Sequence, residues 1–181
     1  MRVFIAALVP EEIKFEIKKY VDEIKPHWEG VKWESSEKLH VTLKFLGEVE
    51  RSKIGEVESC VREAVKVYSP FHMEIARFGG FPNLKNPRVL VIGLNGNPEL
   101  LRLQSEINER LEGLGFAKED RSFLPHITVG RIKTRPKLKG SLPVPQHVPF
   151  LISDIAVMKS VLNPGGSKYF PLSLFKLVKY D

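Results

Sequence analysis

The chain has 181 residues, of which 43% are apolar and 28% charged, with a formal net charge of +6 at pH 7. This balance is typical of one soluble globular domain and excludes an intrinsically disordered chain. The single cysteine, Cys60, excludes an intrachain disulfide framework, and no apolar run reaches the roughly 18 residues of a membrane helix. We therefore expect a cytoplasmic monomer with no membrane partner.

The first half of the chain predicts strands and helices in alternation. Apolar runs indicate buried strands, and apolar residues three or four positions apart indicate amphipathic helices. Pro26 ends the first predicted helix, and Gly79-Gly80 ends the last strand of this half. The expected elements are a strand at 2–9, a helix at 10–25, a short strand at 32–34, a strand at 38–46, a helix at 52–67 and a strand at 71–78.

The second half repeats this order and then departs from it. The expected elements are a strand at 88–94, a helix at 98–113, a short strand at 116–117, a strand at 124–132, and two antiparallel strands at 150–161 and 168–179. Four prolines between residues 135 and 149 exclude an ordinary helix there. That segment is predicted to be a basic loop.

One short motif, His-x-Thr-x, occurs twice and organises the repeat. Its copies are His40-Val41-Thr42-Leu43 and His126-Ile127-Thr128-Val129, and 126 − 40 gives an offset of 86 residues. The same offset relates Arg2-Val3 to Arg88-Val89. We expect one duplicated α+β domain over residues 1–181, with repeat halves of roughly 1–83 and 84–181. Two lobes of mainly antiparallel sheet would carry helices on their outer faces and enclose a central pseudo-twofold cleft.

The motif residues suit acid–base chemistry at phosphorus. Because side chains alternate along a strand, each histidine shares a face with its threonine. Histidine titrates near neutrality, so one imidazole can accept a proton while the other donates one, and threonine hydroxyls can stabilise phosphate oxygens. No metal is required. A lone His-x-Thr is more often structural, and paired histidines also occur in zinc sites, but no Cys, Asp or Glu cluster accompanies either motif. The other histidines lack this context and are expected to be structural or at the surface: His27, His72 and His147.

A basic segment follows the second motif, with cations at alternate positions: Arg131, Lys133, Arg135, Lys137 and Lys139. Clustered cations attract polyanions such as nucleic acid and steer their approach. A solvated basic loop without any ligand is the alternative interpretation.

The motifs with their flanks, Leu39 to Glu48 and Phe123 to Arg131, resemble the two-histidine phosphoesterase superfamily. Within it they are similar to the RNA 2′,3′-cyclic phosphodiesterases, also called 2′-5′ RNA ligases. The resemblance implies metal-independent opening of a terminal 2′,3′-cyclic phosphate to a 2′-phosphate, without a cofactor. It also implies the reverse joining of such an end to a 5′-hydroxyl. The implied partner is RNA with cyclic phosphate ends, such as those of tRNA halves.

Residue by residue, the resemblance makes His40 and His126 catalytic and Thr42, Thr128 and Arg131 phosphate-binding. Arg131 lies five positions after His126, so regular alternation puts it on the opposite face. It can reach the phosphate only if the strand bends or bulges near Gly130. A 2′-phosphate product requires water to enter opposite the 3′-oxygen, and we assign His40 as the acid and His126 as the base.

Further residues are candidates for contact with the RNA itself: Lys133, Arg135 and Lys137 for its backbone, and Phe45 and Phe123 for base stacking. Most aromatic residues near the motifs, Phe4 and Trp33 included, are nevertheless expected in the core. Two alternatives to an RNA phosphodiesterase remain: a non-catalytic protein that binds RNA ends, and a cyclic phosphodiesterase acting on a small nucleotide.

Overall fold

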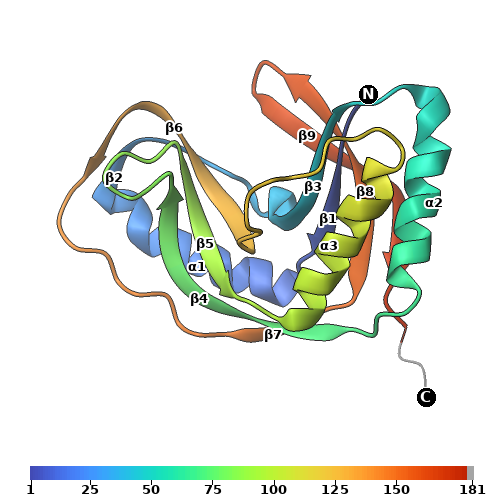
Figure 1. The fold of residues 1–181 in the computed structure, drawn as a ribbon. Helices are drawn as coiled ribbons and strands as arrows, with labels where there is room; N and C mark the ends of the chain where they lie inside the picture. The colour runs from blue at the N-terminus through green and yellow to red at the C-terminus, as the bar shows by residue number, and fades with distance from the viewer. Residues whose placement is uncertain (179–181) are drawn as a thin grey trace.

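A computed structural model gives the fold and describes residues 1–178. Two groups of strands diverge from the middle of the molecule, where β3 and β6 lie (Figure 1). No helix within the described residues is long and apolar enough to cross a membrane. The elements in chain order are β1 (Arg2–Leu8), α1 (Glu11–Ile24), β2 (Trp28–Trp33), β3 (His40–Glu48), α2 (Ile54–Val65), β4 (Phe71–Phe81), β5 (Val89–Asn95), α3 (Pro98–Glu112), β6 (His126–Leu138), β7 (Pro149–Ile152), β8 (Asp154–Asn163) and β9 (Gly166–Lys176).

The strands form one curled antiparallel sheet in the order β7-β4-β5-β6-β3-β1-β8-β9, with β2 paired to β6. This confirms the predicted duplicated α+β class, with one correction. The two sheets that were expected are joined, because β3 pairs with β6 at the single position Val41↔Ile127. The two lobes therefore meet at the middle residues of the two His-x-Thr motifs.

Each lobe is built around a strand that is buried on both faces. β1 lies between β3 and β8, and its residues 3–7 are all buried. β5 lies between β4 and β6, and its residues 90–94 are likewise buried. A sheet with one exposed face would alternate, so these near-continuous apolar runs show that both faces of each central strand are covered. In both lobes the motif strand is the neighbour of the central strand.

The helices exchange lobes. α1 follows β1 but packs on the β4–β5 lobe, where the ring of Tyr20 lies 5.9 Å from that of Phe78. α3 follows β5 but packs beside β3, where Gln104 Nε2 donates a hydrogen bond of 3.2 Å to the Leu43 carbonyl. Figure 1 shows α3 next to α2 on the β1–β3 side. Each lobe is therefore assembled from both halves of the chain.

Three expectations about the second half were wrong. The predicted strand at 150–161 is two strands, since β7 pairs with β4 in one lobe and β8 with β1 in the other. No strand forms at 116–117. The second motif strand was expected to end at 132, but β6 continues to Leu138 beside β2. The loop predicted between residues 135 and 149 is confirmed for residues 139–148, which form neither helix nor strand. This loop is anchored: Tyr20 donates a 2.8 Å hydrogen bond to the Pro143 carbonyl. The last predicted strand was placed at 168–179, and its residue 179 lies outside the described residues.

A buried lysine ties the first motif strand to α3. Lys44 is 6% exposed and Asn108 is 5% exposed. The Lys44 ammonium donates to the side-chain oxygen of Asn108 and, at 2.7 Å, to the Ala117 carbonyl. Burial lowers the pKa of Lys44. The contact fixes the start of the segment that leads into the second motif.

We predict that Lys44→Met lowers the free energy of unfolding by about 1–3 kcal/mol, because the buried Asn108 oxygen loses its charged donor. Urea denaturation followed by circular dichroism measures the change. Lys66→Met is the control, since its ion pair with Glu63 is solvent-exposed and such pairs contribute about 0–1 kcal/mol. Equal stabilities of the two variants would contradict the prediction.

Candidate active site

Both motifs face one cleft between the lobes. His40 and Thr42 reach it from β3, and His126 and Thr128 reach it from β6. The bridge between Val41 and Ile127 puts the two motifs next to each other at the lobe junction. The remaining cleft residues are Arg2, Phe4, Lys32, Glu34, Lys38, Phe45, Arg131, Lys133, Ser160, Leu162, Asn163, Gly166, Ser167 and Tyr169.

A β-bulge follows the threonine in each motif strand. In β6, Thr128 and Gly130 pair with the consecutive residues Val91 and Leu90, which leaves Val129 as an extra residue. A bulge shifts the alternation by one position, so Arg131 returns to the face of Thr128 and lines the cleft. This is the irregularity that Arg131 was expected to require.

The first motif strand carries the same irregularity. Thr42 and Lys44 pair with the consecutive residues Ala6 and Ile5, so Leu43 is the extra residue. The residue five positions after the histidine again faces the cleft, and here it is Phe45. The Arg2 guanidinium lies 4.9 Å from the centre of the Phe45 ring. The two sides of the cleft thus match in backbone but offer an arginine on one side and an aromatic ring on the other.

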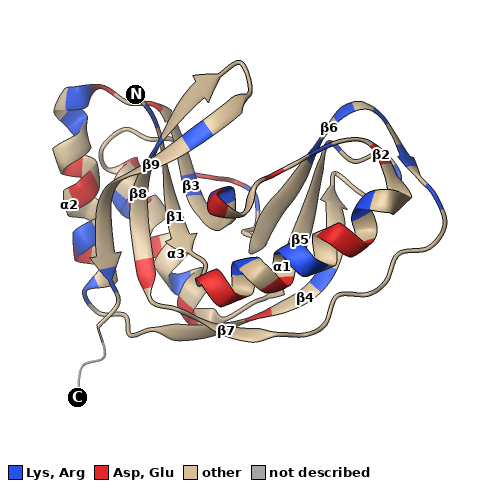
Figure 2. Ribbon diagram, turned by 180° about the vertical axis from the view of Figure 1, so that it is seen from behind, with Lys and Arg blue, Asp and Glu red and all other residues tan. Residues whose placement is uncertain are grey.

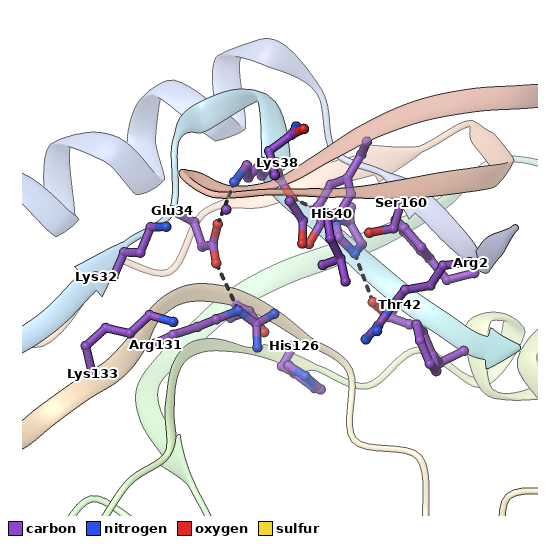
Figure 3. Close-up of a pocket in the computed structure, with 18 residues that line it drawn as sticks. Arg2, Lys32, Glu34, Lys38, His40, Thr42, His126, Arg131, Lys133 and Ser160 are labelled. Carbon is purple, nitrogen blue, oxygen red and sulfur yellow. Dashed lines mark hydrogen bonds and ion pairs between the residues drawn. The ribbon is translucent and has the colours of Figure 1, made fainter. Parts of the chain in front are cut away.

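The two imidazoles are oriented in the same way. Nδ1 of His40 lies 2.7 Å from the carbonyl oxygen of Lys38, and Nδ1 of His126 lies 2.7 Å from that of Leu124. A carbonyl only accepts, so each Nδ1 carries the proton and each Nε2 is left for other partners. Nε2 of His40 lies 2.9 Å from the Thr42 hydroxyl. Figure 3 shows His40 and Thr42 joined by this contact, opposite His126.

Aromatic rings hold both histidines. The His40 ring stacks on Phe4 at 4.8 Å between centroids, and Tyr169 meets it edge-on at 5.4 Å. His126 has Phe81 edge-on at 4.9 Å. Burial lowers the pKa of His40, and the positive charge of Arg131 lowers it further, although the Lys38 carbonyl and Glu34 act in the opposite direction. The net effect lowers the pKa of His40 and favours its neutral form.

We predict an imidazole pKa for His40 below the ordinary value of about 6.5. Arg131→Gln should raise it, because the substitution removes a nearby positive charge and frees the Glu34 carboxylate. Titration of the ring protons by NMR, with His40→Asn used for assignment, measures both values. A measured pKa for His40 at or above that ordinary value would contradict the prediction.

Of the other site residues proposed from the sequence, some line the cleft and some do not. Lys133 and Phe45 line the cleft. Arg135 and Lys137 are exposed on β6 beyond it, and Figure 2 shows basic segments following β6 away from the lobe junction. Phe123 packs against the hydrophobic core and does not line the cleft, so its proposed stacking on RNA is not supported.

Several cleft residues were not identified from the sequence. Glu34 and Lys38 follow β2, and Ser160 and Tyr169 come from β8 and β9. No motif marks them, because they reach the cleft only through the pairing of β8 with β1 and of β2 with β6. Arg2 was noted in the sequence only as part of the 86-residue repeat and not as a cleft residue.

The comparisons with known proteins agree with this architecture. The model of the family "LigT like Phosphoesterase" matches the chain twice, at residues 8–91 and 92–169. A protein of Methanocaldococcus jannaschii named RNA 2′,3′-cyclic phosphodiesterase is 37% identical over 175 residues, covering 93% of this chain and 96% of that protein. One of the same name from Archaeoglobus fulgidus is 34% identical, with coverages of 97% and 100%.

Solved structures give the same result. The crystal structure of TT0787 of Thermus thermophilus superposes with a TM-score of 0.87 at 27% identity, covering 98% of both chains. Escherichia coli LigT, crystallised with 3′-AMP, has a TM-score of 0.82 at 24% identity over 98% of both chains, which shows a shared fold. The protein therefore belongs to the LigT-like phosphoesterases of the two-histidine superfamily.

Proposed function

We propose that this protein is an RNA 2′,3′-cyclic phosphodiesterase, which opens a terminal 2′,3′-cyclic phosphate to a 2′-phosphate. The observation that carries the proposal is the pair of imidazoles, each with Nδ1 on a backbone carbonyl, in one cleft with two threonines and Arg131. Relatives named for this activity match nearly the whole chain. In the reverse direction, the same groups would join the cyclic end to a 5′-hydroxyl through a 2′-5′ bond.

The proposed reaction is an in-line displacement at phosphorus. One imidazole takes a proton from water as its oxygen attacks, and the other protonates the departing 3′-oxygen. Thr42, Thr128 and Arg131 would donate to the non-bridging oxygens, where negative charge grows in the transition state. We propose His40 as the acid and His126 as the base, the assignment made from the sequence. The lowered pKa of His40 makes its neutral form a more available base but also makes its protonated form a stronger acid, so the direction of this shift does not choose between the two roles.

We further propose that the RNA is held on both sides of the phosphate. Phe45 is 51% exposed although it is a large apolar side chain, and it could stack on a base of the RNA. Lys133, Arg135 and Lys137 continue from Arg131 along β6 and suit the phosphates of the preceding nucleotides.

We predict that RNA binding weakens steeply with salt and that the slope decreases in Arg135→Ala and Lys137→Ala. Each phosphate contact that is removed should lower the slope of log K against log salt by about 0.7 for a single strand. Fluorescence anisotropy with a labelled oligonucleotide measures the slope, and Lys66→Ala, just after the end of α2, serves as the control. Slopes that stay at the wild-type value would exclude β6 as the path of the RNA.

The function is tested by turnover with EDTA present. The substrate is a short RNA ending in 2′,3′-cyclic phosphate, and 2′,3′-cyclic AMP is compared in parallel. Formation of a 2′-phosphate on the RNA at a higher kcat/KM than on cyclic AMP supports the proposal. Preference for the mononucleotide would indicate a small-nucleotide phosphodiesterase, and tight RNA binding without ring opening would indicate a binding protein.

A further inference from the structure

Glu34 is a carboxylate in a cleft that is otherwise basic. It follows β2, lines the cleft and has a side chain only 11% exposed. A carboxylate repels a phosphate anion, so direct contact with the substrate gives no reason for its presence here. Its neighbours give another reason, because both of its oxygens face cations.

The carboxylate pairs with Arg131 on the opposite strand. The Nε of Arg131 donates a 3.0 Å hydrogen bond to Oε1 of Glu34. Within residues 1–178 this is the only hydrogen bond of the Arg131 side chain, so its two terminal nitrogens are left for a ligand. Figure 3 shows Arg131 held in this way on the His126 side of the cleft. An arginine fork that binds phosphate through two nitrogens needs a fixed plane.

Glu34 is itself fixed at two further points. Its second oxygen lies 3.6 Å from the Lys38 ammonium, which is 17% exposed. Its backbone N–H donates at 2.9 Å to the carbonyl of Val129, the extra residue of the β6 bulge. The same bulge returns Arg131 to the cleft face. The backbone of Glu34 therefore contacts the bulge at Val129, and its side chain contacts Arg131, two residues further along β6.

We propose that Glu34 is a positioning residue for the ring-opening reaction, acting by holding the Arg131 guanidinium in the orientation that stabilises the transition state. This inference rests on the proposed function and adds a residue to it. Without Glu34 the arginine keeps its charge and its attraction for RNA. It loses the fixed plane, because a free arginine side chain samples many rotamers. The loss should therefore appear in kcat and leave KM unchanged or lower.

The kinetic test is a double-mutant cycle with the cyclic-phosphate RNA. We expect Glu34→Ala to lower kcat by about 10- to 100-fold, the range that misplacement of a transition-state group can cost. Glu34→Gln should retain more activity, since its amide oxygen still accepts from Nε. In an Arg131→Ala background, Glu34→Ala should cause no further loss. An equal loss in both backgrounds, or a loss confined to KM, would overturn the proposal.

The matched control is Glu29→Gln, in the same pair of strands, β2 and β6. Glu29 lies in β2 and pairs with Lys139, just beyond the end of β6, but that ion pair is half-exposed and outside the cleft. Wild-type kcat is expected for this variant. Thermal unfolding of every variant separates misplacement from loss of fold, and Glu34→Gln keeps the shape of the side chain if Glu34→Ala is unstable.

A second readout needs no turnover, so it remains informative if the wild type fails to open the ring. The Nε–H signal of Arg131, assigned by its absence in Arg131→Lys, should exchange slowly with water in the wild type. It should exchange faster in Glu34→Ala and be unchanged in Glu29→Gln. A signal equally protected in Glu34→Ala would disprove the contact, whereas absence of wild-type turnover would disprove only the proposed function.

Discussion

Alanine in place of either His40 or His126 should lower the single-turnover rate of ring opening by about 10²- to 10⁴-fold. Each substitution removes one of the two proton transfers and leaves the other in place. Both imidazoles are partly exposed to the cleft, so the fold should survive, which circular dichroism checks. Rates are measured with EDTA and saturating RNA. Activity within a few-fold of wild type in either variant would exclude the two-imidazole mechanism.

The roles of the two histidines can be separated with a substrate whose 3′-oxygen is replaced by sulfur. A thiolate leaves without being protonated, so a variant that lacks only the acid recovers its rate on this substrate. We expect recovery in His40→Ala and not in His126→Ala. Recovery in His126→Ala alone would exchange the two roles and make His40 the base.

Arg131→Ala should lower kcat by about 10²- to 10³-fold, the loss seen when a single preorganised donor to a transition-state oxyanion is removed. Arg131→Lys should recover only part of it, because an ammonium keeps the charge without the planar fork. Single-turnover rates and KM on the cyclic-phosphate RNA measure both effects.

The control for Arg131 is Arg102→Ala, a substitution of an exposed arginine that pairs with Glu99 on α3. A general effect of lost positive charge would lower activity in both variants and would act through KM. If Arg131→Ala and Arg131→Lys were equally impaired in KM alone, the arginine would be a binding contact and not a stabiliser of the transition state.

The sequence predicted the class of the fold well because the signals are local. Alternation in the motif strands and helical spacing in 10–25, 52–67 and 98–113 depend on near neighbours in the chain. The division of 150–161 between the two lobes was not predictable in this way. Nothing in the local sequence marks Ser153 as the residue between β7, which pairs with β4, and β8, which pairs with β1. The long β6 was missed because Pro136 in it argues against regular structure. β2 nevertheless pairs with β6 on both sides of Pro136, at Lys137 and at Ile132.

In the candidate site, too, only the residues with a local sequence signal were predicted. Both histidines and threonines stand in a repeated motif, and the need for a bulge before Arg131 followed from counting residues. Glu34 gave no such signal, because its importance lies in a contact with a residue 97 positions away. Phe123 was assigned to RNA by its closeness in sequence to His126, but packing against the core decides its place.

The matching bulges with different side chains have a consequence for how this cleft arose. Two separate copies of a half-length chain, associated as a homodimer, would place the same residue five positions after each histidine. Such a cleft could hold two arginines or two aromatic rings, but not Arg131 facing Phe45. Fusion of the halves into one polypeptide removes that constraint, so the two sides can carry different side chains, an arginine on one and an aromatic ring on the other. α1 and α3 each pack on the lobe that does not contain the strand before them, and this keeps the two unlike lobes together.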